Sequence, residues 1–243
     1  MPTQLLFTRI LNSHLATHVD ALLLRLHIHP ANASAPISDT LMMELVISSL
    51  LLLYFAAVRV TLHVEKPSTV QHFAEMTHEA ISGQADSIIG HGSERYVTFL
   101  TVLAIFILPC NLVGLIPGLD SPTANVVVPL GLALLTFAYY HYHGIRKHGF
   151  GYIKQFLGPL WWLAPLLMPI EIISHFARVL SLTVRLYANI FAGALITLVF
   201  FSLIPVGLPL VFMSLHLLVA VLQAFVFMLL AMIYLSLALS EEH

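Results

Sequence analysis

The chain has 243 residues, of which 59% are apolar and only 9% are charged, and its formal net charge is -2 at pH 7. With a mean hydropathy of +0.92, this composition excludes a soluble domain, and the charge leaves no basic surface for nucleic acid. Several apolar segments approach the roughly 20 residues needed to cross a hydrocarbon core of about 30 Å, without the alternation of barrel strands. We therefore expect an all-α integral membrane protein with about five membrane helices and an interfacial amphipathic helix.

The first 40 residues mix leucines with charged and polar side chains, and they lack the apolar core and cleavage site of a signal peptide. We predict that residues 1–40 form an N-terminal segment on the outer side of the membrane and that residues 41–243 form the membrane domain. The single cysteine, Cys110, lies in an apolar segment. It therefore supports no disulfide framework, and we interpret its thiol as a small packing group.

Hydropathy predicts membrane helices at about 41–62, 96–119, 125–142, 163–203 and 210–239. Between the first two, residues 67–89 interleave three acidic residues with apolar side chains, a pattern too polar to span but typical of a helix lying at the interface. The second membrane helix is predicted to be broken near its end by Pro109, Gly114, Pro117 and Gly118.

The segment 163–203 is far longer than one perpendicular crossing requires, so we expect a strongly tilted helix. Pro205, Gly207 and Pro209 predict a turn that joins it to the last helix in a long hairpin. Before this hairpin, residues 143–148 form a polar break. Residues typical of a membrane interface follow the break: Tyr152, Lys154, Trp161 and Trp162.

Lysines and arginines outside the predicted helices indicate the orientation, because positive charge resists translocation. They gather in or beside the first and third loops: Arg59, Lys66, Arg95, Arg146, Lys147 and Lys154. The second and fourth loops contain no Lys or Arg. We therefore predict an outer N-terminus and a cytoplasmic C-terminus.

A polar stripe follows one face of the predicted helix 163–203. Glu171, Arg178 and Arg185 recur every seven residues, a spacing that keeps them nearly in line on a helix of 3.6 residues per turn. Further polar residues join or flank this face: Ser174, His175, Ser181 and Asn189. An Arg at the centre of a membrane helix costs roughly 2.5–3.5 kcal/mol on insertion scales. No acidic residue lies within a helical turn of Arg185, so we expect its partner on another chain or in a water-filled path.

Two interpretations of Glu171 and Arg178 stay open: they pair internally and lock the helices together, or they line a path for ions. The last helix carries His216, Gln223 and Tyr234. In an antiparallel hairpin, Gln223 is expected level with residues 185–189, with His216 nearer the outer surface and Tyr234 nearer the cytoplasm.

A haem-bearing cytochrome and a secondary transporter are two alternative classes of membrane protein. The 14 histidines permit a haem-bearing cytochrome, although only His175 and His216 lie well inside predicted helices. A secondary transporter usually has an internal repeat with broken helices in both halves, and none is seen here. The sequence contains no phosphate-binding loop or nucleophile motif, so we expect neither catalysis by the chain alone nor a cofactor.

At the polar stripe the sequence strongly resembles subunit a of the F-type ATP synthase, the stator half of a membrane proton motor. The resemblance extends in order from about Glu65 to the C-terminus. The matching segments are NLVGLIPG at 111–118, PTAN at 122–125, PIE at 169–171, SLTVRLYAN at 181–189 with AG at 192–193, HLLVAVLQAF at 216–225 and YLS at 234–236.

This resemblance implies that Arg185 is the essential arginine facing a rotating ring of c subunits. It implies that Glu171 and Ser181 line a cytoplasmic half-channel and that an outer half-channel is lined by Asn189, His216, Gln223 and Asp120. His175, Arg178 and Tyr234 are expected to support these residues. The sequence departs from some family members at position 194, where the family pattern often has an acidic residue or a histidine and this chain has Ala194.

The implied partners are the c-subunit ring, the b subunits of the peripheral stalk, the remainder of the F1Fo complex and membrane lipid, with no nucleic acid. The implied location is a bacterial inner membrane. The implied function is proton translocation coupled to ring rotation and ATP synthesis, through a subunit that is not itself catalytic.

Overall fold

The fold is all-helical throughout the part of the chain that the computed structural model describes, namely residues 8–10, 12–13, 19, 37–60, 62–63, 68–116, 119–152, 164–203 and 207–240. The long helices are α2 (Asp39–Val60), α3 (Thr69–Ile88), α4 (Glu94–Leu112), α5 (Val127–His148), α7 (Ala164–Leu203) and α8 (Leu208–Leu239). Short 3-10 turns are η1 (Val113–Leu115), η2 (Pro122–Ala124) and η3 (Gly149–Gly151). The predicted interfacial residues Lys154, Trp161 and Trp162 lie outside the described residues, as does most of the predicted segment 1–40.

Four helices of the described residues are long and apolar enough to cross a membrane: Asp39–Val60, Glu94–Leu115, Pro165–Leu203 and Leu208–Leu239. The fifth predicted crossing, α5, has 22 residues but is less apolar, because tyrosines and histidines occupy its second half. It nevertheless packs against both α7 and α8. The all-α membrane fold predicted from the sequence is confirmed.

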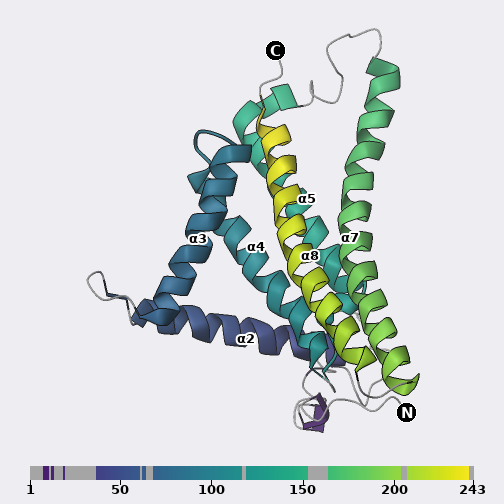
Figure 1. The fold of residues 1–243 in the computed structure, drawn as a ribbon. Coiled ribbons are helices and arrows are strands. Elements are labelled where there is room, and N and C mark those ends of the chain that lie inside the picture. Colours follow the sequence, from purple (N-terminus) through teal and green to yellow (C-terminus); the bar gives the residue numbers. More distant parts are fainter. Residues whose placement is uncertain are drawn as a thin grey trace.

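The helices run in two very different directions (Figure 1). Helices α2, α3 and α4 contact one another in pairs and form the sides of a triangle. Helices α7 and α8 lie side by side as a hairpin, and α2 runs across the direction of this hairpin. The 22 residues of α2 extend about 33 Å, close to a hydrocarbon core, whereas the 40 residues of α7 extend about 60 Å. A helix of that length fits within a bilayer only when it is strongly tilted.

The core lies where α4 and α5 pack against the hairpin. Its most deeply buried side chains include Leu100, Ile107, Leu186, Ile190, Phe227 and Met232. By contrast, many large apolar side chains of α2 and α7 are exposed, as expected for surfaces that meet lipid or neighbouring subunits. Cys110 is fully buried in the core, as its apolar context predicts.

The break in the second membrane helix falls later than Pro109, which lies inside α4. Membrane helices tolerate an internal proline when neighbouring groups bind the freed backbone carbonyls. The helix ends at Leu112 instead, and the chain folds back so closely that a Cβ atom on Gly114 would lie 2.8 Å from Cβ of Ser121. Gly114 is therefore the breaker that permits this turn.

A buried polar network holds the returning loop in place. Ser121 donates to the Cys110 carbonyl at 2.7 Å, and Thr123 donates to Oδ1 of Asn111 at 2.8 Å. Nδ2 of Asn111 then donates to the Ala220 carbonyl at 3.1 Å, which ties α4 to α8. Because buried polar groups that are fully paired specify one arrangement, this network fixes the loop that carries Asp120 against the hairpin.

The predicted polar break at 143–148 is wrong as a boundary, because these residues form the last turns of α5. Arg146, Lys147 and His148 occupy the last helical turn, where positive charge interacts favourably with the helix dipole. Lys147 also donates from Nζ to the Leu239 carbonyl at 2.8 Å, near the end of α8. The helix predicted at 67–89 is confirmed as α3, whose first turn is capped by Ser68, while its place at the membrane interface stays a prediction.

Candidate functional site

Arg185 occupies the middle of α7, 18 residues from its C-terminal end at Leu203 by sequence number. Its side chain is half-buried, and no hydrogen bond or ion pair joins it to any residue that the structure describes. Ser181, one turn earlier, is exposed. A guanidinium cannot become neutral in a protein, so Arg185 has to meet water or an anion from outside the described chain.

One turn beyond Arg185, the two hairpin helices are joined by a polar contact. Nδ2 of Asn189 donates to Oε1 of Gln223 at 3.0 Å. Gln223 is 4% exposed, and its own amide nitrogen has no hydrogen-bond partner among the described residues. This contact confirms the prediction that Gln223 lies at the same height along the hairpin as residues 185–189.

His216 packs against the facing helix at its smallest residue. A Cβ atom on Gly193 would lie 3.0 Å from Cγ of the His216 ring, so any other residue here would require the imidazole to shift by a few tenths of an ångström. The side chain is 4% exposed, and its Nε2 atom is buried without a partner among the described residues. Buried polar atoms are normally paired, so this nitrogen marks a place for water or for a transferable proton.

A cavity of about 760 Å³ opens beside His216. Its lining includes Asp120 from the loop after α4, Ala194 and Thr197 from α7, and His216 from α8. Asp120 is exposed. The cavity therefore brings together Asp120 and His216, the two predicted outer residues that can carry a proton, and Ala194 belongs to the same lining.

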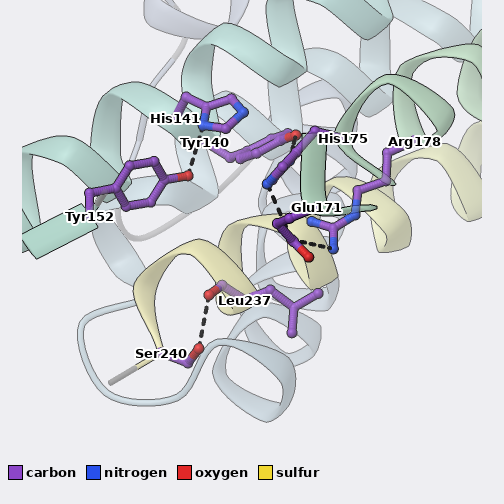
Figure 2. Close-up of polar contacts among 8 residues, drawn as sticks. All are labelled: Tyr140, His141, Tyr152, Glu171, His175, Arg178, Leu237 and Ser240. Carbon is purple, nitrogen blue, oxygen red and sulfur yellow. Dashed lines mark hydrogen bonds and ion pairs between the residues drawn. The ribbon is translucent and has the colours of Figure 1, made fainter. Parts of the chain in front are cut away.

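A second polar group surrounds Glu171, 14 residues before Arg185 and therefore about 21 Å away along the helix. Nε2 of His175 lies 3.4 Å from the Glu171 carboxylate, and Nη2 of Arg178 lies 3.9 Å from it (Figure 2). The Arg178 guanidinium also lies over the Tyr234 ring, 5.4 Å from its centroid. Arg178 thus has the internal partners that a locking role requires, in contrast to Arg185.

Aromatic and imidazole side chains from α5 and from Tyr152, which follows η3, extend this second group. The Tyr140 hydroxyl is 3.0 Å from Nδ1 of His175, and the Tyr152 hydroxyl is 2.7 Å from Nδ1 of His141 (Figure 2). The rings of His141 and His175 lie 4.7 Å apart between centroids. Burial raises the pKa of the Tyr152 phenol to about 12, so this hydroxyl stays protonated at neutral pH and is able to donate.

The predicted residues thus fall into two groups separated by Arg185. Asn189, Gln223, His216 and Asp120 lie towards the hairpin turn, and Glu171, His175, Arg178 and Tyr234 lie towards the other end. Sequence reasoning missed Tyr140, His141 and Glu44. For Glu44, the one feature of the sequence that could have pointed to a functional role is a carboxylate inside an otherwise apolar predicted membrane helix. Within the described residues, no cluster of three or more metal-binding side chains occurs.

Comparison with known proteins gives a consistent result over the whole chain. Residues 40–236 match the family described as ATP synthase A chain. A protein of Koribacter versatilis, "ATP synthase subunit a", is 50% identical over 100% of both chains. Proteins of the same description from Solibacter usitatus and Geobacter sulfurreducens are 40% and 42% identical, over 96% and 90% of this chain and 99% and 93% of their own.

Proposed function

Because this chain belongs to the ATP synthase A chain family, the subunit a family, we propose that Arg185 separates two proton half-channels along the α7–α8 hairpin. The family is the non-catalytic proton-channel subunit of the Fo membrane sector, so the chain is a multi-pass membrane protein of an F1Fo complex. The observation that carries the proposal is a guanidinium that has no partner among the described residues and lies between two polar groups along one hairpin.

The outer half-channel is formed by the cavity beside His216. A proton from the outer side enters past Asp120, reaches His216 and passes the Asn189–Gln223 pair on its way to a ring carboxylate. The unpaired Nε2 of His216 and the unpaired amide of Gln223 support this route, because both atoms lack a partner inside the described residues. Water in the cavity carries the proton past Ala194, which has no group that could bind it.

The inner half-channel leads past Ser181 to Glu171, and it opens through the polar group around Glu171 that Figure 2 shows. The Glu171 carboxylate accepts a proton released near Arg185, and water at the cytoplasmic surface removes it. His175 and Arg178 position this carboxylate by their contacts at 3.4 and 3.9 Å. In this proposal, Arg178 serves the path by holding Glu171 and does not itself carry protons.

Arg185 acts on the ring carboxylate through its fixed charge. A positive charge within about 4–6 Å favours the ionised form of a carboxylate, so a ring acid that reaches Arg185 releases its proton to the inner path. The same charge repels protons that could jump directly between the two half-channels. Each proton that crosses a potential of 100 mV is worth about 2.3 kcal/mol, and this separation makes ring rotation the route that captures it.

The proposal also specifies surroundings and orientation. The c ring faces the Arg185 side of α7, and the b subunits of the peripheral stalk contact the complex elsewhere. The membrane is a bacterial inner membrane, which agrees with the bacterial sources of the relatives, and the N-terminus lies outside with the C-terminus in the cytoplasm. The coupling ion is the proton.

The test is replacement of Arg185 by Ala in the intact complex. We expect ATP-driven proton pumping into vesicles to be abolished, while ATP hydrolysis by the detached catalytic head is unchanged. Arg146→Ala is the matched control, since it removes the same charge from an exposed position in the last turn of α5. Pumping retained by Arg185→Ala would refute the proposal.

A further inference from the structure

Glu44 is a carboxylate placed inside an apolar membrane span. It lies in α2, five residues after the helix start at Asp39 and therefore about 7.5 Å along the axis. The side chain is half-buried, and no hydrogen bond or ion pair to another described residue involves it. A carboxylate at such a position is costly unless it lines water or meets a partner, so it requires a functional reason.

The surroundings of Glu44 contain no counter-charge among the described residues. Glu44 lines a cavity of about 440 Å³ between α2, α4 and α5. The lining of this cavity is mostly apolar; its polar residues beside Glu44 are Ser38, Thr40 and Asn125, and the described lining has neither Lys nor Arg. Since a water molecule occupies about 30 Å³ in the liquid, the space is large enough for several water molecules beside these polar groups.

This cavity adjoins the one that contains His216. Thr40 and Asn125 line both cavities, and Nδ2 of Asn125 donates to Oγ1 of Thr40 at 3.2 Å where the two meet. Side-chain hydroxyl and amide groups orient water at this boundary, although neither group carries a proton itself. Glu44 therefore lines a cavity that shares two polar residues with the cavity of Asp120 and His216.

We propose that Glu44 is a second proton-accepting entrance to the outer half-channel, which delivers protons through the water at Thr40 and Asn125 to the His216 cavity. The carboxylate takes a proton from outer water and releases the same proton to water in the adjoining cavity, so no other reactant is needed. This inference rests on the proposed half-channels, and it adds a residue of α2 to a route otherwise built from the hairpin and the loop before α5.

The first test measures proton flux through the Fo sector of the full complex in liposomes, driven by an imposed potassium diffusion potential. Because Asp120 remains as a parallel entrance, removing one of two comparable entrances leaves about half of the flux, so we expect Glu44→Gln to lower flux about twofold. Glu44→Asp retains a carboxyl group and restores most of the flux. Glu79→Gln is the control, because it removes an exposed carboxylate of α3 that lines neither cavity.

The second test measures access directly. In a Cys110→Ala background, Glu44→Cys reacts with a membrane-impermeant cationic thiol reagent added from the outer side, and the reaction lowers proton flux further. Unchanged flux in Glu44→Gln overturns the inference, as does a thiol at position 44 that the outer reagent cannot reach. A Glu44→Gln complex that loses its b subunits also overturns it, because Glu44 is then a docking contact.

These outcomes differ from failure of the half-channel proposal. If Arg185→Ala retains pumping, the half-channels themselves are refuted. If Arg185→Ala abolishes pumping while Glu44→Gln conducts normally, only the Glu44 entrance is refuted.

Discussion

The contact between Gly193 and His216 gives the hairpin register a direct test. An ideal Cβ atom on Gly193 lies 3.0 Å from Cγ of His216, and a carbon–carbon bond adds about 1.5 Å. The two Cβ atoms of a Gly193→Cys/His216→Cys pair are therefore at most about 4.5 Å apart, within the 3.5–4.5 Å range of disulfides. Replacing the imidazole by cysteine also removes the ring that would collide with a side chain at 193.

We expect this pair to form a disulfide within the chain on mild oxidation of the assembled complex in a Cys110→Ala background. A protease site inserted between residues 203 and 208 makes the bond visible, because linked halves stay together on a non-reducing gel. The control pair joins Gly193→Cys with Leu222→Cys, whose native side chain is 50% exposed and six residues from His216. Equal linkage of both pairs, or no linkage at 193 and 216, would refute the register and with it the position of His216 beside the outer cavity.

Two further predictions concern the outer path and the loop that forms it. His216→Ala is expected to slow proton flux most when the outer pH is high, because proton delivery is then limiting; a pH profile parallel to the wild type would remove His216 from the path. In Gly114→Val, the added Cβ would lie 2.8 Å from Cβ of Ser121. Overpacking of this kind typically lowers the free energy of unfolding by about 1–3 kcal/mol. We expect this variant to lower the thermal stability of the purified complex, whereas Gly131→Ala, at a glycine with nothing within 4 Å of its added Cβ, serves as the tolerated control.

Several features of the site follow from local sequence pattern. The alignment of Glu171, Arg178 and Arg185 depends only on helical periodicity, and the bounds of the hairpin helices depend on apolar length and the breakers after 203. The prediction that Gln223 lies level with residues 185–189 needed one further assumption, an antiparallel hairpin. The Asn189–Gln223 hydrogen bond at 3.0 Å confirms it.

Other features were predicted incorrectly or missed, because they depend on contacts between distant segments. Pro109 was expected to break α4, yet its helix continues and the chain turns at Gly114. Helix α5 continues to His148, beyond the predicted end. Its last turn lies beside the end of α8, where Lys147 donates to the Leu239 carbonyl and stabilises this turn. Propensity alone gives no information about such neighbours.

Hydropathy and helical periodicity are properties of neighbouring residues, so the amino-acid order is enough to predict an all-α membrane protein with a long hairpin that carries an arginine without a nearby acidic residue. Which polar residues share a space depends on the packing of distant helices. The tertiary structure separated Arg178, which has internal partners, from Arg185, which has none among the described residues. It also joined Glu44, Asp120 and His216 through two adjoining cavities. These relations arise from packing of helices far apart in the chain, and no local pattern specifies them.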